Sequence, residues 1–136
     1  MSEPGRPLPS LTDPVSAPFW AACREGRLEL QRCAACGAIR WPPARRCPVC
    51  LSADAALERL SGHGVVWSHA RYERALHPAF ATLVPYVVLA VALEEGPVMI
   101  AGLSGPEDGL EVGAAVSVVF TQVADGVTLP QFALCH

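Results

Sequence analysis

Residues 33–50, CAACGAIRWPPARRCPVC, decide the fold of the N-terminal half of this chain. They contain two C-x2-C pairs, Cys33/Cys36 and Cys47/Cys50, separated by ten residues. A pair of thiolates at this spacing wraps one side of a tetrahedral ion, and two pairs complete a shell of four sulfurs. The spacing predicts one structural zinc ion in a small ribbon. Four thiolates leave no open coordination position, so catalysis at this metal is not expected.

Other chemistry fits the same cysteines. Iron in a redox protein would use the same four ligands, and the thiols could also stay reduced or pair as disulfides. Leu51 departs from the pattern, because a glycine often follows the second pair of such a ribbon. Of the two remaining thiols, Cys23 is expected to be a small buried apolar residue, and Cys135 has no clear base partner apart from His136.

Outward from the cysteines toward the N-terminus, residues 1–15 read as a flexible proline-rich arm. Ser16, followed by Pro18, is typical of a helix start, and the helix is expected to end near Gly26. Residues 28–31 alternate as a strand that leads into the first cysteine pair. We therefore assign residues 16–57 to a helix plus zinc ribbon.

Toward the C-terminus, from Arg59 onward, the spacing of the apolar residues changes from the period of a helix to the alternation of a strand. Residues 51–58 could form a helical turn or a loop, and 59–72 are expected to form one long strand that Gly62 and Gly64 bend or bulge. Two hairpins follow, because turn residues separate strands at 86–93 and 98–103 and again at 116–123 and 127–134. Five strands with little helix predict a mainly β protein, and residues 58–136 fit a five-stranded barrel such as the OB-fold. A curled five-stranded sheet of another topology fits the same pattern.

Charge argues against one class of partner. Residues 1–60 hold eight Arg and six acids, whereas residues 61–136 hold two Arg and seven acids, and the chain has no lysine. Nucleic-acid binding rests on many contacts from basic side chains to phosphates, so it is the weaker alternative for a zinc-ribbon/OB protein. No apolar stretch has membrane-span length and no export signal is recognisable, so we expect a cytoplasmic protein.

No motif for a nucleophile, a phosphate loop or a dinucleotide site occurs in the sequence. The chain by itself is therefore not expected to be an enzyme. Three groups of residues are candidates for contact with a partner or with coenzyme A: large aromatic residues near the ribbon, the two arginines at the end of the predicted strand 59–72 and just after it, and two ring side chains in the connection at 73–84. These candidates are Phe19, Trp20, Trp41, Arg71, Arg74, His77 and Phe80.

A series of short motifs recurs in order along the chain: PFW (18–20), EGRLELQRC (25–33), CG (36–37), WPP (41–43), CPVC (47–50), LSGHGVVWS (60–68), PYVVLAVALEEG (85–96), VG (112–113) and LPQF (129–132). In this order they resemble the rubredoxin-like zinc ribbon joined to an OB-fold that accompanies thiolases, lipid-transfer-protein-type aldolases and other acyl-CoA enzymes. The resemblance covers nearly everything from residue 16 onward.

The resemblance implies a non-catalytic accessory subunit. Such a subunit binds and stabilises a thiolase-like acyl-CoA enzyme, a thiolase or a retro-aldolase, in steroid side-chain or fatty-acid type degradation. The implied assembly is a hetero-oligomer in which the OB domain lies near the acyl-CoA channel. The four cysteines correspond to the family's zinc ligands.

Overall fold

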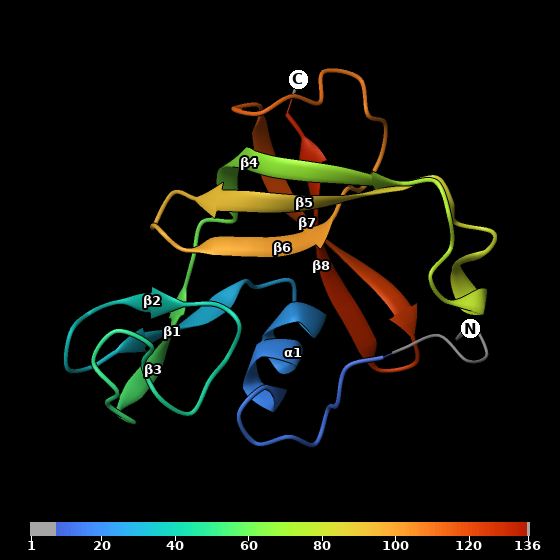
Figure 1. Ribbon diagram of the computed structural model, residues 1–136. Coiled ribbons are helices and arrows are strands. Elements are labelled where there is room, and N and C mark those ends of the chain that lie inside the picture. The colour runs from blue at the N-terminus through green and yellow to red at the C-terminus, as the bar shows by residue number, and fades with distance from the viewer. Residues whose placement is uncertain (1–7, 136) are drawn as a thin grey trace.

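The structure is a computed structural model that describes residues 8–135. The first part of the predicted arm (1–7) and His136 lie outside the described residues. Within the described range the chain forms two antiparallel sheets with one α-helix between them (Figure 1). This arrangement confirms the prediction of a mainly β protein with an N-terminal helix and ribbon.

Helix α1 spans Ala17–Arg24 and follows Ser16 at the N-cap position, as predicted. Pro18 lies in the first turn, where its missing N–H costs nothing. The helix ends before Gly26, whose φ of +76° suits the reversal of the chain. The Ser16 side chain makes no capping hydrogen bond, so the helix depends on packing of its buried face instead.

The ribbon sheet is built from β1 (Glu29–Cys33), β2 (Ile39–Arg40) and β3 (Ala55–Arg59), in the order β2-β1-β3. The prediction of a helical turn or loop over 51–58 is therefore wrong for its second half. Alanine and leucine favour a helix locally, but the free edge of β1 pairs with this segment from Glu29 to Cys33. Arg32 also binds Glu58 across the pair, with Nη2 and Oε2 2.6 Å apart.

The second sheet has five strands in the order β6-β5-β4-β7-β8. Its edges, β6 and β8, meet where Leu103 bridges Phe132 and the Ser104 amide donates to the Phe132 carbonyl, 2.8 Å away. Both predicted hairpins are confirmed by the pairing of β5 with β6 and of β7 with β8. The strands are β4 (His63–Tyr72), β5 (Tyr86–Leu93), β6 (Val98–Gly102), β7 (Ala115–Ala124) and β8 (Val127–Leu134).

The continuous strand predicted over 59–72 is divided in the structure. β3 ends at Arg59 in the ribbon sheet, and β4 begins at His63 in the other sheet. Gly62 makes the turn between them with a φ of +82°. The bulge in β4 lies between Val66 and Ser68, where the register with β5 shifts, and not at either glycine. The connection after β4 contains a short 3-10 helix, η1 (Pro78–Phe80).

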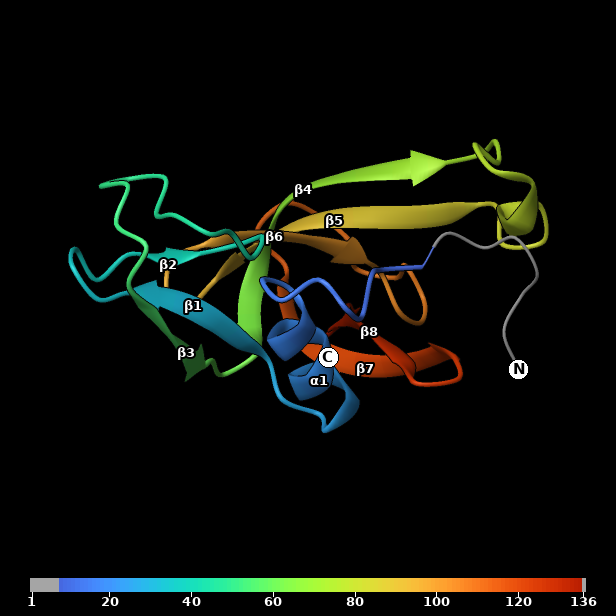
Figure 2. The ribbon, with the colours of Figure 1, turned by 90° about the horizontal axis from the view of Figure 1, so that it is seen from below.

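One hydrophobic core joins the two halves of the chain. Phe19 and Cys23 from α1 and Leu30 from β1 belong to the same buried cluster as Leu89 and Phe132 of the five-stranded sheet. Figure 2 shows α1 lying beside β7 and β8, which are its main contacts outside the ribbon. No helix in the described range is long and apolar enough to cross a membrane.

Gly64 offers a test of the packing of β4 on β5. A Cβ atom on Gly64 would lie 2.6 Å from the Ala92 carbonyl oxygen, which is backbone and cannot move aside. We expect Gly64→Ala to lower the free energy of unfolding by about 1–3 kcal/mol. Gly102→Ala is the matched control, because its Cβ would meet nothing closer than 3.6 Å. Urea denaturation monitored by tryptophan fluorescence measures both, and equal losses would contradict the packing described.

Candidate functional site: zinc ribbon and aromatic pocket

The four predicted sulfur ligands converge in the structure. The Sγ atoms of Cys33, Cys36, Cys47 and Cys50 all lie within 4.8 Å of one another. Two pairs, Cys33/Cys50 and Cys36/Cys47, are 3.5 Å apart, far beyond the roughly 2.05 Å of a disulfide. A tetrahedral zinc ion with Zn–S bonds of about 2.3 Å requires sulfurs about 3.8 Å apart. The residues present therefore fit one structural zinc ion.

Backbone amides prepare the first cysteine of each pair as a thiolate. The amide N–H of Cys36, and next that of Ala35, donate to the Cys33 sulfur and lower the pKa of that thiol to about 6. The amide of Cys50 has the same relation to Cys47, whose thiol pKa is also lowered. The second cysteines, Cys36 and Cys50, also have backbone hydrogen bonds, with Ala38 and Ser52, but contact with the other sulfurs raises their thiol pKa values. Since metal binding requires thiolates, the backbone of each turn favours zinc binding chiefly at its first cysteine.

The two cysteine pairs close with matching turns. The Gly37 amide donates to the Cys33 carbonyl and the Leu51 amide to the Cys47 carbonyl, both at 2.9 Å. Gly37 has a φ of +79°, and Leu51 has a φ of +68°, the one described non-glycine residue with a positive φ. Leu51 thus occupies a left-handed conformation that is unfavourable for a residue with a side chain and that glycine adopts without cost. The residue is 68% exposed.

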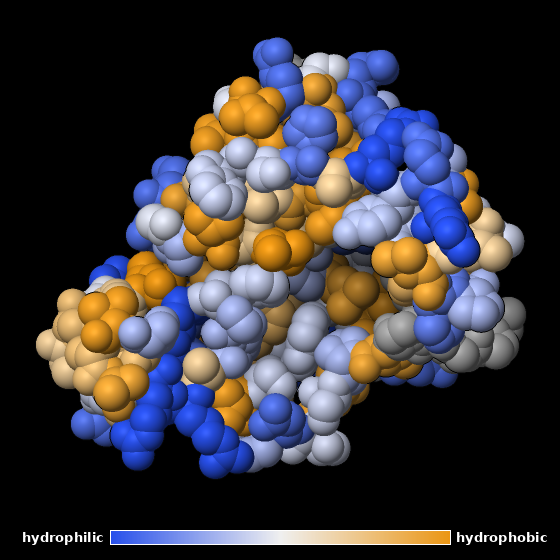
Figure 3. Space-filling view, in the orientation of Figure 1, coloured by the Kyte–Doolittle hydropathy of each residue, from blue (hydrophilic) through white to orange (hydrophobic). Residues whose placement is uncertain are grey.

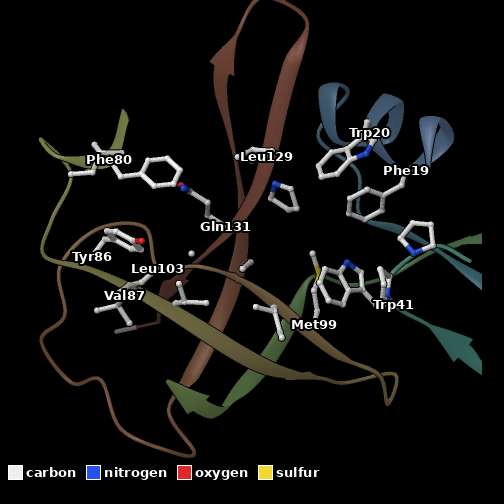
Figure 4. Close-up of a pocket in the computed structure, with 18 residues that line it drawn as sticks. Phe19, Trp20, Trp41, Phe80, Tyr86, Val87, Met99, Leu103, Leu129 and Gln131 are labelled. Atoms are coloured by element: carbon white, nitrogen blue, oxygen red, sulfur yellow. The ribbon is translucent and has the colours of Figure 1, made fainter. Parts of the chain in front are cut away.

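An apolar pocket of about 490 Å³ lies between the ribbon, α1 and the five-stranded sheet. It follows residues 99–102 of β6 and 129–131 of β8, just before the point where these edges meet. Figure 4 shows Trp20 and Trp41 on one side of the pocket and Phe80 on the other. Apolar side chains are visible in the recess beneath β5 and β6 in the space-filling view (Figure 3). We call this site the aromatic pocket.

Ring contacts order the walls of the aromatic pocket. Phe19 and Trp20 pack edge to face with centroids 4.8 Å apart, and Phe80 meets Tyr86 in the same manner at 6.0 Å. Gln131 supplies a polar group in the middle of the pocket (Figure 4). Its Oε1 accepts a hydrogen bond from the Thr121 hydroxyl at 2.9 Å, which fixes the amide group.

The structure brings together four of the predicted contact residues and separates the others. Phe19, Trp20, Trp41 and Phe80 all line the aromatic pocket, although they come from α1, the ribbon and η1. The remaining three candidates, Arg71, Arg74 and His77, do not line it.

Local contacts explain the position of two of these three residues. Arg71 binds Glu73 and Glu107, with its Nη1 2.8 Å from Glu107 Oε1, so its charge is used within the chain. His77 accepts a hydrogen bond from the Ala79 amide through Nδ1 at 3.1 Å and caps η1. Its ring also packs against Phe80, with centroids 5.8 Å apart. His77 therefore does not line the pocket itself but packs against Phe80, which does.

Sequence reasoning missed Tyr86 and Gln131 as pocket residues. Both fall on strands whose partners could not be known from the sequence, although both lie within the motifs that carry the family resemblance. The expectation for Cys23 is confirmed, because it is fully buried and burial raises its thiol pKa to about 12. Cys135 is exposed.

A four-cysteine ribbon joined to a five-stranded sheet whose two edges meet at one bridge defines the class of zinc-ribbon/OB-fold proteins. The family model described as "ChsH2, rubredoxin-like zinc ribbon domain" matches residues 20–57. The model described as "ChsH2, C-terminal OB-fold domain" matches residues 57–121. The chain belongs to the ChsH2 family, also described as DUF35.

Solved structures agree with this assignment. The structure titled "Ltp2-ChsH2(DUF35) aldolase" contains a chain with 35% sequence identity and a TM-score of 0.79, matched over 95% of this chain and 98% of that one. A DUF35 protein of unknown function from Sulfolobus solfataricus has 12% identity and a TM-score of 0.64, over 93% of this chain and 89% of that one. At this identity the second match shows the fold alone.

A curated relative from Thermomonospora curvata, a "Probable enoyl-CoA hydratase alpha subunit", is 37% identical over 129 residues. The match includes 93% of this chain, but the chain spans about two fifths (39%) of the relative's length. The similarity therefore concerns one part of that longer protein.

The zinc site gives a direct prediction. We expect one zinc ion per chain, and Cys47→Ser to abolish zinc retention and unfold the ribbon, because structural zinc supplies about 10–16 kcal/mol of apparent binding free energy in zinc-finger peptides, which are of similar size. Elemental analysis and thermal unfolding with and without a chelator measure this. The control is Cys135→Ser, since Cys135 is exposed and lies outside the cluster. Full zinc content in the Cys47 variant would exclude the four-sulfur site.

Proposed function

We propose that this chain is a non-catalytic accessory subunit that binds and stabilises an aldolase- or thiolase-type acyl-CoA enzyme. The observation that carries the proposal is the convergence of Phe19, Trp20, Trp41 and Phe80 on one apolar pocket. Aromatic residues around a desolvated pocket are typical of the centres of protein interfaces. The match to a chain of an Ltp2–ChsH2 aldolase supports a partner of that type.

A second apolar feature lies on the ribbon. Val49 is 72% exposed and Leu51 is 68% exposed, and both sit in the turn that holds the second pair of zinc ligands. Zinc would hold this turn rigidly, so the two side chains would be presented with little loss of conformational entropy on binding. Figure 3 shows apolar side chains gathered on the ribbon loops at the lower left. This ribbon tip (Val49 and Leu51) is proposed to contact the partner as well.

The aromatic pocket lacks groups that could perform acyl-CoA chemistry. Among the described residues that line it there is no carboxylate, histidine, cysteine, lysine or arginine, and Tyr86 is the one ionisable side chain. A nucleophile, a base and an oxyanion stabiliser do not converge there. We therefore assign the reaction to the partner and the shaping of its surroundings to this chain.

The proposal also concerns the class of substrate, an acyl-CoA bound at the interface between this chain and its partner. Apolar walls with one fixed amide at Gln131 suit the uncharged portion of an acyl-CoA at the interface. The hydratase relative belongs to the same substrate class by its name, so a hydratase could be a second kind of partner. Degradation of steroid side chains or of fatty acids is the metabolic setting that the resemblance implies.

Alanine substitutions test the proposed interface. We expect Trp20→Ala or Phe80→Ala to weaken association with a co-expressed Ltp2-type aldolase by about 2 kcal/mol or more, roughly 30-fold in Kd, since such anchors dominate interface energies. Size-exclusion chromatography and isothermal titration calorimetry of the purified complex measure the loss. Trp67→Ala is the matched control, because Trp67 is 63% exposed and does not line the pocket.

The outcome separates three possibilities. Equal loss in the Trp20 and Trp67 variants would remove the aromatic pocket from the interface. Turnover of acyl-CoA thioesters by this chain alone would contradict the accessory role. Unchanged association in the Trp20 and Phe80 variants, with impaired turnover by the complex, would keep the pocket as a substrate site and exclude it as a docking site.

A further inference from the structure

Arg40 is a buried cation at the end of β2. The residue is 5% exposed, and its guanidinium donates from Nε to Gln31 Oε1 at 3.0 Å and from Nη2 to the Ala44 carbonyl at 2.9 Å. The same Gln31 oxygen also accepts from the Ala44 amide at 2.8 Å. These bonds fix the position of the guanidinium, but both of its partners are neutral.

The charge of Arg40 has no counter-ion in the described part of the chain. Its Nη1 atom is buried and has no hydrogen-bond partner, and no ion pair joins Arg40 to a carboxylate. A buried charge without a partner of opposite sign is costly, because the desolvation penalty is not offset. A negative charge near Arg40 would offset this penalty.

A second pocket of about 310 Å³ borders Arg40 and shares no lining residue with the aromatic pocket. Arg45 lines it too, and in the described residues that guanidinium makes no ion pair. The lining residues within the described range include no acidic side chain and none of the zinc-binding cysteines. The other groups around it are Gln31 and small apolar residues of the ribbon and of the segment before α1.

The start of α1 adds to the positive field. Pro18 in the first helical turn lines this pocket, no acidic residue occurs in that turn, and Ser16 makes no capping bond. The positive end of the helix dipole is thus not compensated by an acidic side chain there. Arg40, Arg45 and the start of α1 thus line one cavity, and no carboxylate is among the described residues that line it.

We propose that this cavity is an oxyanion site that takes a phosphate group, with Arg40 and Arg45 as its counter-charges. Two cations favour a doubly charged phosphate over a singly charged carboxylate, and guanidinium groups suit its oxygens. The phosphate could belong to a free ion or to a nucleotide. The proposal is independent of the partner and of the aromatic pocket.

Calorimetric titration of the zinc-loaded chain with inorganic phosphate tests the site, with ionic strength held constant by chloride. We expect saturable binding of one phosphate per chain. Arg45→Gln should weaken it about tenfold or more, since a charged hydrogen bond is lost. Arg45→Lys keeps the charge and should retain part of the affinity. Arg24→Gln is the control, because Arg24 lies in the last turn of α1 and outside this pocket.

Adenosine 3′,5′-bisphosphate and acetate complete the experiment. Tighter binding of the bisphosphate than of free phosphate identifies a nucleotide phosphate as the ligand, whereas equal binding identifies the free ion. Acetate binding as tightly as phosphate overturns the preference for phosphate. Absence of saturable binding by both phosphates, or equal affinity in wild type and Arg45→Gln with zinc content unchanged, overturns the site.

Discussion

Four sulfurs around one position are the constraint on which the N-terminal half of this protein depends. Within residues 33–50, the buried residues are Cys33, Arg40 and Cys47, so the ribbon has almost no apolar core. A segment of this kind needs a metal to offset the conformational entropy lost on folding. Once fixed, the ribbon places Trp41 against the aromatic pocket and presents Val49 and Leu51 to solvent.

The aromatic pocket exists because the five-stranded sheet closes incompletely. β6 and β8 meet at Leu103 and Phe132, and before that point they diverge. α1 and the ribbon cover the gap from one side, and the connection after β4 covers it from the other (Figures 1 and 4). A tighter barrel would have filled the gap with its own side chains and left no concave surface.

Features that depend on residues close together in the sequence could be predicted from it. Features that depend on contacts between residues far apart in the sequence could not. The zinc ligands follow from spacing, and the two hairpins from their turns. β3 was missed because its alanines favour a helix and only the free edge of β1 makes it a strand. The sequence does not show that the Arg71 guanidinium is paired, because its acceptor, Glu107, lies 36 residues away in sequence. Phe80 and Trp20 were named, but their meeting in one pocket depends on the whole topology.

Because α1 packs against the last hairpin, the hydrophobic core can be completed only after nearly the whole chain has been synthesised. Phe19 leaves the ribosome more than a hundred residues before Phe132, its companion in the core. At about 5–20 residues per second, α1 waits roughly 5–20 s with its apolar face uncovered. The cysteine ribbon involves only nearby residues and needs no later strand to bring its ligands together. Zinc binding can therefore fix the ribbon early in synthesis, while the apolar face of α1 stays exposed until β7 and β8 have been made.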